Sequence, residues 1–195
     1  MTERLDFNVQ EKRENMDECL ILIDNSNVFI GGQEFSARKR NLPYQQDFTW
    51  RIDFGSVLRK VANGHTIIKA ILVGSTPPPN DSLWSAAKNV GFDVITYERS
   101  PSGGEKVVDT ELLASGLKVV YKHPRPAVLK LLSGDRDFIP LIRNAYEEKW
   151  ETELWGFSHT IANELQQMVN RVILLDDIFD EIGKNQPFQA QNTSW

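Results

Sequence analysis

Six short apolar runs recur along the chain, and stretches with the spacing of amphipathic helices separate them. The runs are residues 19–24, 66–74, 93–97, 127–133, 151–157 and 171–175. The helical patterns are residues 53–63, 81–90, 105–121, 137–149, 160–169 and 176–182. Strands that are apolar on both faces and alternate with helices are typical of a parallel sheet covered on both sides. The pattern therefore predicts an α/β fold, a three-layer α/β/α sandwich with a mainly parallel central sheet.

Length and composition indicate a single domain. The chain has 195 residues, and 41% of them are hydrophobic, which is enough for one sizeable core. We expect a flexible N-terminal arm over 1–17, the domain over 18–183 and a flexible C-terminal tail over 184–195. No stretch approaches the roughly 20 apolar residues of a membrane span, and the charged N-terminus lacks the apolar centre of a signal peptide.

The single cysteine, Cys19, excludes an internal disulfide and fits a reducing compartment. We therefore expect a cytoplasmic protein with no membrane partner. A homodimer is compatible with the sequence, although no surface stripe demands one.

The formal net charge is −5, from 22 Lys and Arg against 27 Asp and Glu. This balance argues against a binder of duplex DNA, which is usually strongly basic. A local basic rim can still oppose an acidic pocket. The runs Arg38–Arg40 and Lys122–Arg125 are candidates for such a rim, although charges of this kind are more often simply solvated.

Polar residues gather where predicted strands end. Asp24 closes the first run, and Ser133 closes the fourth, followed after Gly134 by Asp135 and Asp137. In open parallel sheets, ligands bind beyond the carboxyl ends of the strands. These side chains are therefore expected to meet at one edge of the sheet.

A further acid, Asp109, lies near the start of the helix predicted over 105–121. At helical spacing it continues a mainly apolar stripe of Leu112, Gly116 and Val120, so it is expected to face inward. A carboxylate in that position is costly unless it is paired or bound to a cation.

Each of these acids also has an ordinary structural interpretation. Asp137 could cap a helix that starts at 138, and Asp135 could be a turn residue beside Gly134. Asp24, Ser26 or Asn27 could cap a short helix over 27–33. Asp109 could be a solvated acid in a first helical turn. Taken together, carboxylates gathered at one edge repel each other and favour a compensating cation. Oxygen ligands of this kind suit Mg²⁺ or Mn²⁺.

Three segments in this order, LILIDNSNVF (20–29), KVVDTELLASG (106–116) and LLSGDRDFIPLI (131–142), resemble the signature of NYN-domain proteins. More narrowly, the chain resembles the LabA-like branch of the PIN-like nuclease superfamily. The resemblance covers roughly residues 18–182. It implies a PIN-like α/β sandwich and metal-dependent cleavage of phosphodiesters, usually in RNA.

Matched motif by motif, the resemblance assigns metal binding and catalysis to the acids Asp24, Asp109, Asp135 and Asp137. Asn27 matches the polar residue after the first acid, and Ser133 matches the residue that opens the last block. We expect an endoribonuclease that uses Mg²⁺ or Mn²⁺ and acts on single-stranded or structured RNA, with single-stranded DNA as a further candidate. The alternative is a non-catalytic RNA-binding or scaffold protein on the same fold.

We hypothesise that Asp24 and Asp135 bind the main ion. Asp109 and Asp137 would complete its shell, hold a second ion or orient the attacking water. Asn27 and Ser133 would position ligands by hydrogen bonding, and Lys106 and Arg136 are candidates for phosphate contacts. Two further candidates for substrate contact are Trp84 and His159, although a core position is the commoner reading for Trp84 and a local loop role for His159.

Overall fold

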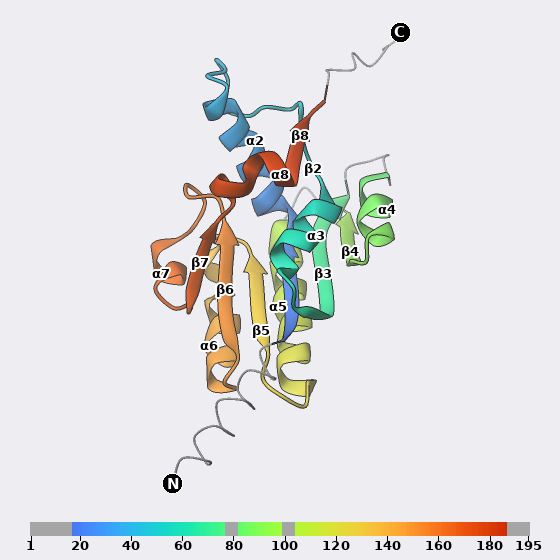
Figure 1. Ribbon diagram of the computed structural model, residues 1–195, viewed down its shortest axis with the longest axis vertical. Helices are drawn as coiled ribbons and strands as arrows, with labels where there is room; N and C mark the ends of the chain where they lie inside the picture. The colour runs from blue at the N-terminus through green and yellow to red at the C-terminus, as the bar shows by residue number, and fades with distance from the viewer. Residues whose placement is uncertain (1–16, 77–81, 99–103, 187–195) are drawn as a thin grey trace.

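A six-stranded sheet forms the centre of the molecule, with every neighbouring pair of strands parallel. The computed structural model describes residues 17–76, 82–98 and 104–186. The strand order is β4-β3-β1-β5-β6-β7 (Figure 1). The strands are β1 (Glu18–Asp24), β3 (Thr66–Thr76), β4 (Asp93–Glu98), β5 (Val128–Leu132), β6 (Glu151–Gly156) and β7 (Arg171–Leu174). All six predicted strands are confirmed.

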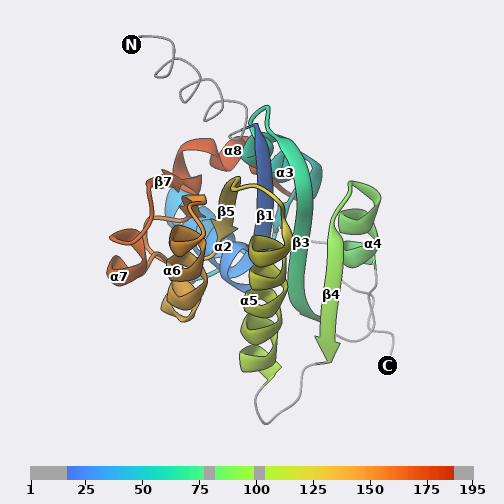
Figure 2. The same cartoon turned by 90° about the horizontal axis from the view of Figure 1, so that it is seen from below.

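Helices cover both faces of this sheet. Cys19, Ile21 and Ile23 of β1 pack in one core with α2 (Asn25–Lys39), α3 (Phe54–Ala62), α4 (Ser82–Asn89) and α8 (Phe179–Ile182). Leu20 and Leu22 pack in the other core with α5 (Gly104–Lys122), α6 (Ile139–Glu147) and α7 (Asn163–Gln166). Figure 2 shows α5 and α6 on one side of the sheet and α3 and α8 on the other. The predicted α/β/α sandwich is therefore confirmed. Its physical cause is that strands with two apolar faces bury both faces only when helices pack on both sides of the sheet.

The direction in which the chain builds the sheet reverses between β1 and β5. The chain passes from β1 to β3 and β4 on one side, and later fills β5, β6 and β7 on the other. In open α/β sheets, the point where the strand order reverses leaves a crevice at the carboxyl ends of the two central strands. The residues that follow β1 and β5 therefore face a common space.

A small second sheet was not predicted. Strand β2 (Trp50–Ile52) pairs antiparallel with β8 (Gly183–Asn185), and Gln186 N–H donates to the Thr49 carbonyl at 2.8 Å. Strand β8 begins at Gly183, where the predicted domain ends, and continues to Asn185. The predicted arm, apart from residue 17, and the rest of the predicted tail lie outside the described residues.

The helix after β1 is also longer than the pattern indicated. The pattern allows a short helix over 27–33, whereas α2 runs from Asn25 to Lys39. None of the helices in the described part of the chain is long and apolar enough to cross a membrane.

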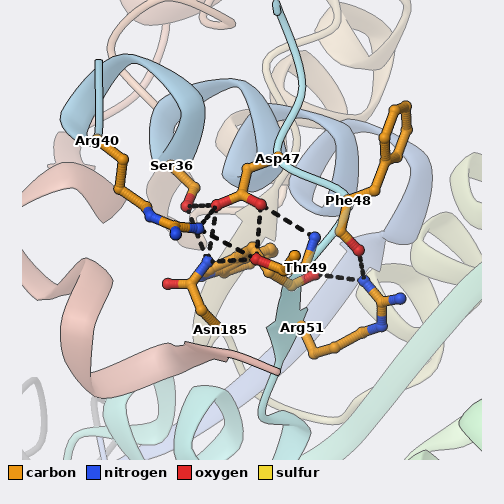
Figure 3. A network of polar contacts seen from close by, with 8 residues as sticks. Ser36, Arg40, Asp47, Phe48, Thr49, Arg51 and Asn185 are labelled. Atoms are coloured by element: carbon orange, nitrogen blue, oxygen red, sulfur yellow. Dashed lines mark hydrogen bonds and ion pairs between the residues drawn. The ribbon is translucent and has the colours of Figure 1, made fainter. Parts of the chain in front are cut away.

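A buried aspartate ties the second sheet to α2. Asp47 is 0% exposed, and its carboxylate accepts hydrogen bonds from Ser36 Oγ (2.7 Å), Arg40 (2.6 Å) and Asn185 Nδ2 (2.7 Å). Thr49 adds its backbone N–H at 3.0 Å and its hydroxyl at 2.6 Å (Figure 3). Burial alone would raise the pKa of Asp47, but these donors outweigh it and hold the pKa well below its usual range. The charged form of Asp47 therefore joins α2, the turn that precedes β2, and β8.

Candidate metal centre

The carboxyl ends of β1 and β5 are joined by side-chain hydrogen bonds. Ser133, directly after β5, donates its hydroxyl to Asp24 Oδ2 at 3.0 Å. The Gly134 N–H donates to Asn27 Oδ1 at 3.0 Å. Three of the predicted residues, Asp24, Asn27 and Ser133, therefore lie together at the crevice.

Asp24 lies at this crevice and also caps a helix. It is 4% exposed and caps α2 by accepting the Asn27 N–H at 3.2 Å, so the capping interpretation of Asp24 holds. Burial raises the pKa of Asp24, the hydrogen bonds from Asn27 and Ser133 oppose this rise, and the Asp135 charge adds to it. A cation in the pocket would favour the charged form of this carboxyl.

Glycine is required at position 134 because another loop passes directly over it. A Cβ atom there would lie 2.0 Å from the Thr160 carbonyl oxygen. The Gly134 carbonyl accepts the Ala162 N–H at 2.9 Å, which holds the two loops together. The segment that carries Asp135 is thereby fixed from two sides, by Asn27 of α2 and by residues 160–162.

Asp135, rather than Asp137, caps the turn that follows. Its Oδ1 accepts the Asp137 N–H at 2.9 Å and so starts the short 3-10 turn η1 (Arg136–Phe138). Its own N–H donates to Ser133 Oγ at 3.2 Å. Helix α6 then begins at Ile139 with no side-chain cap. The exposed carboxylate of Asp137 therefore has no part in capping α6.

Asp109 approaches this turn from the first half of α5. On α5, the stripe predicted to face inward does so, since Leu112 and Val120 are buried and a Cβ at Gly116 would meet Leu22 at 2.6 Å. Carboxylate oxygens of Asp109, Asp135 and Asp137 lie within 4.8 Å of one another. Half-buried and exposed carboxylates thus converge from two segments more than twenty residues apart.

The chemistry of this group fits a hard divalent cation. All three possible ligands are carboxylate oxygens, with no histidine or cysteine among them. Mg²⁺ binds oxygen at about 2.1 Å, so opposite ligands of one ion lie about 4.2 Å apart. Adjacent ligands of an octahedral ion lie about 3.0 Å apart. An inward movement of the three carboxylates, whose oxygens lie within 4.8 Å of one another, would bring them to adjacent positions on one ion.

The acids border a pocket of about 300 Å³. Asp24, Asp109 and Asp135 contribute to its wall, although Asp24 is not among the three converging carboxylates. The other lining residues are Ser26, Asn27, Ile30, Gly31, Glu34 and Thr160. The acids thus mark one end of a cavity large enough for more than an ion.

The remaining predicted contacts are placed as follows. Arg136 is exposed beside the acids, whereas the Lys106 side chain lies outside the described residues. Trp84 is a core residue and is 1% exposed. Its ring packs against Gly74, where an added Cβ atom would lie 2.4 Å from the ring. The run Lys122–Arg125 precedes β5 and so lies at the amino edge of the sheet, opposite the pocket.

Sequence reasoning missed one residue of the pocket that carries charge. Glu34 lines the pocket. Its carboxylate lies 3.0 Å from His159 Nε2 and 3.8 Å from the Arg38 guanidinium. Burial and the Arg38 charge lower the pKa of His159, while Glu34 opposes the shift. The missed signal was the spacing of Asn27, Gly31 and Glu34, which places them on one face of a longer helix.

Comparison with known proteins places the chain in a family. The model of the NYN domain family matches residues 19–176. The crystal structure of VPA0982, a protein of unknown function from Vibrio parahaemolyticus RIMD 2210633, is similar in fold, with a TM-score of 0.66 at 15% sequence identity. The alignment covers 87% of this chain and 98% of that one. No curated protein matches the chain significantly.

Proposed function

The chain belongs to the NYN domain family, whose members are PIN-like nucleases, and we propose that it is a divalent-metal-dependent endoribonuclease. The observation that carries the proposal is the convergence of Asp109, Asp135 and Asp137 within 4.8 Å at the carboxyl edge of the sheet. Carboxylates at this spacing are stable together when a cation neutralises them. The LabA-like branch within the family stays a prediction.

In this proposal, Asp109, Asp135 and Asp137 hold Mg²⁺ or Mn²⁺. Bound divalent ions supply charge neutralisation at a phosphate and a water of lowered pKa. Asp24 forms the buried wall of the pocket and, through Ser133, orients the backbone that carries Asp135. Asn27 fixes the same backbone at Gly134. Arg136, and Lys106 at the start of α5, are proposed to contact phosphates of the substrate.

The proposed substrate is single-stranded or structured RNA, with single-stranded DNA as a second candidate. The acidic net charge of −5 weakens non-specific attraction to a duplex, which depends on many phosphate contacts. Unpaired nucleotides offer base faces and edges that a small pocket can bind without a large basic surface. We also propose a cytoplasmic location and a homodimer.

Cleavage of a closed circular RNA tests this proposal. We expect the protein to linearise a single-stranded circle when Mn²⁺ or Mg²⁺ is present and to leave it intact in EDTA. A circle has no ends, so its linearisation requires an endonuclease. The products are resolved on a denaturing gel, with linear RNA, single-stranded DNA and duplexes as parallel substrates.

Two results would contradict the proposal. Cleavage that persists in EDTA would exclude the metal-dependent mechanism. Binding of RNA without cleavage under Mn²⁺ and Mg²⁺ would favour the non-catalytic RNA-binding or scaffold alternative.

A further inference from the structure

A second pocket of about 510 Å³ adjoins the metal pocket along α2. Glu34 lines both pockets, so the two lie next to each other at this side chain. The other residues that line the second pocket are Ala37, Arg38, Asn41, Leu42, Tyr44 and Gln45. None of them was assigned to the metal centre.

One face of α2 forms the floor of both pockets. Asn27, Gly31, Glu34 and Arg38 follow each other at intervals of three or four residues, which places them in one row along the helix. Arg38 comes eleven residues after Asn27, which is about 16 Å along the helix axis. Bases stacked in one strand are about 3.4 Å apart. The row therefore spans a few nucleotides, starting at the acids.

The second pocket carries the groups that bind single-stranded nucleic acid. Tyr44 is 53% exposed and offers a ring face for base stacking. Arg38 is an exposed cation for a phosphate, and Asn41 and Gln45 supply amide donors and acceptors for base edges. Its neighbours in the basic run are engaged elsewhere, Lys39 with Asp180 and Arg40 with Asp47. Arg38 is thus the member of the run that lines the pocket.

Glu34, at the junction of the two pockets, does not present a bare negative charge. His159 Nε2 lies 3.0 Å from its carboxylate and Arg38 lies 3.8 Å away. A strand that passes over this point meets a carboxylate already held by two partners. The junction can therefore border a sugar or base without strongly repelling the phosphates on either side.

The loop that carries Tyr44 is anchored at both ends. Leu42 N–H donates to the Ala37 carbonyl at 2.9 Å, and Asp47 N–H donates to the Gln33 carbonyl at 2.9 Å. The buried Asp47 carboxylate also binds Arg40, as Figure 3 shows. A binding loop that is already ordered loses less conformational entropy when a ligand binds.

We propose that the second pocket is a nucleotide subsite, in which Tyr44 stacks on a base of single-stranded RNA and Arg38 contacts a neighbouring phosphate. The strand runs from the metal pocket along α2 to this subsite. The inference rests on the proposed function for the path of the RNA strand, because the metal pocket marks where the strand is cut. The binding itself does not depend on cleavage.

Binding of fluorescent oligoribonucleotides of 2 to 12 residues tests the subsite. Fluorescence anisotropy is measured in EDTA and again in Ca²⁺, and a gel checks that the RNA stays intact. We expect Tyr44→Ala to weaken binding of the 12-mer by about 5- to 100-fold, as loss of one stacked base does. Tyr44→Phe should bind nearly as wild type because it keeps the ring, and Arg38→Gln should weaken binding and reduce its salt dependence.

The matched control is Tyr146→Ala. Tyr146 is 70% exposed near the end of α6, which runs away from the site, so its loss should change no affinity. The dinucleotide is too short to reach from the acids to the subsite, so its cleavage in Mn²⁺ should be the same for wild type and Tyr44→Ala. Circular dichroism confirms that each variant is folded.

Failure of the subsite and failure of the proposed function give different results. If wild type cleaves RNA but Tyr44→Ala binds the 12-mer as wild type does, the subsite is refuted and the nuclease stands. If wild type cleaves nothing but binding depends on Tyr44, the subsite stands and the nuclease is refuted. If wild type binds no oligomer in EDTA or in Ca²⁺, the subsite is refuted.

Discussion

Asp135→Asn should reduce metal-dependent RNA cleavage by at least about 100-fold and leave the fold intact. Loss of a partner that only orients a metal ligand already costs about 10- to 100-fold in metal affinity or activity, and loss of a ligand should cost more. The asparagine keeps an oxygen that can accept the Asp137 N–H, now 2.9 Å from Asp135 Oδ1. The substitution therefore removes charge while it preserves the turn. Initial rates at several Mn²⁺ concentrations measure the loss.

Asp93→Asn is the matched control for this substitution. Asp93 is exposed at the start of β4, at the opposite edge of the sheet, and pairs with Lys69 at 3.0 Å. The Asp93→Asn variant should cleave RNA at the wild-type rate. Asp109→Asn and Asp137→Asn should resemble Asp135→Asn, because all three carboxylates converge. Retention of most of the activity by Asp135→Asn would show that the catalytic ion lies elsewhere.

Asp47→Ala should lower the free energy of unfolding by about 3 kcal/mol, the cost of breaking a buried charged network from one side. The substitution leaves Ser36, Arg40, Thr49 and Asn185 without the carboxylate that all four bind. Urea denaturation followed by circular dichroism measures the change. Asp180→Ala, which removes an exposed ion pair with Lys39, should cost less than about 1 kcal/mol.

The same network predicts how stability depends on pH. The pKa of Asp47 is held below its usual range in the folded protein. A depressed carboxyl pKa stabilises the fold at pH values above the unfolded pKa of about 4 and loses this contribution as the pH falls below it. Asp47→Asn should therefore be less stable than wild type at pH 7, with the difference shrinking toward pH 3. A difference that is constant across this range would contradict the assignment.

The sheet could be predicted from the sequence because each strand is a separate apolar run. Burial on both faces makes the runs continuous, and their alternation with helices fixes a parallel arrangement. The meeting of Asp24 and Asp135 at one pocket could be predicted for a related reason, since Asp24 ends β1, Asp135 follows β5, and a parallel sheet brings these strands together. The switch of strand order between β1 and β5 makes these strands neighbours.

Features that depend on contacts between distant short segments could not be predicted. Strands β2 and β8 have three residues each and lie more than 120 residues apart, so no local pattern reveals their pairing. In the sequence, Asp47 looks like an ordinary loop acid. Its four side-chain partners come together only in the folded protein. Assigning the helical cap to Asp135 rather than Asp137 needed the geometry of the 3-10 turn.

The central claim is that Asp109, Asp135 and Asp137 form a divalent-metal site, and a crystal soaked in Mn²⁺ tests it most directly. The account predicts an anomalous difference peak about 2 Å from carboxylate oxygens of all three residues. The peak should weaken strongly in Asp135→Asn crystals and persist in Asp93→Asn crystals. A fully soaked wild-type crystal with no peak among these carboxylates, or with peaks only elsewhere, would contradict the account.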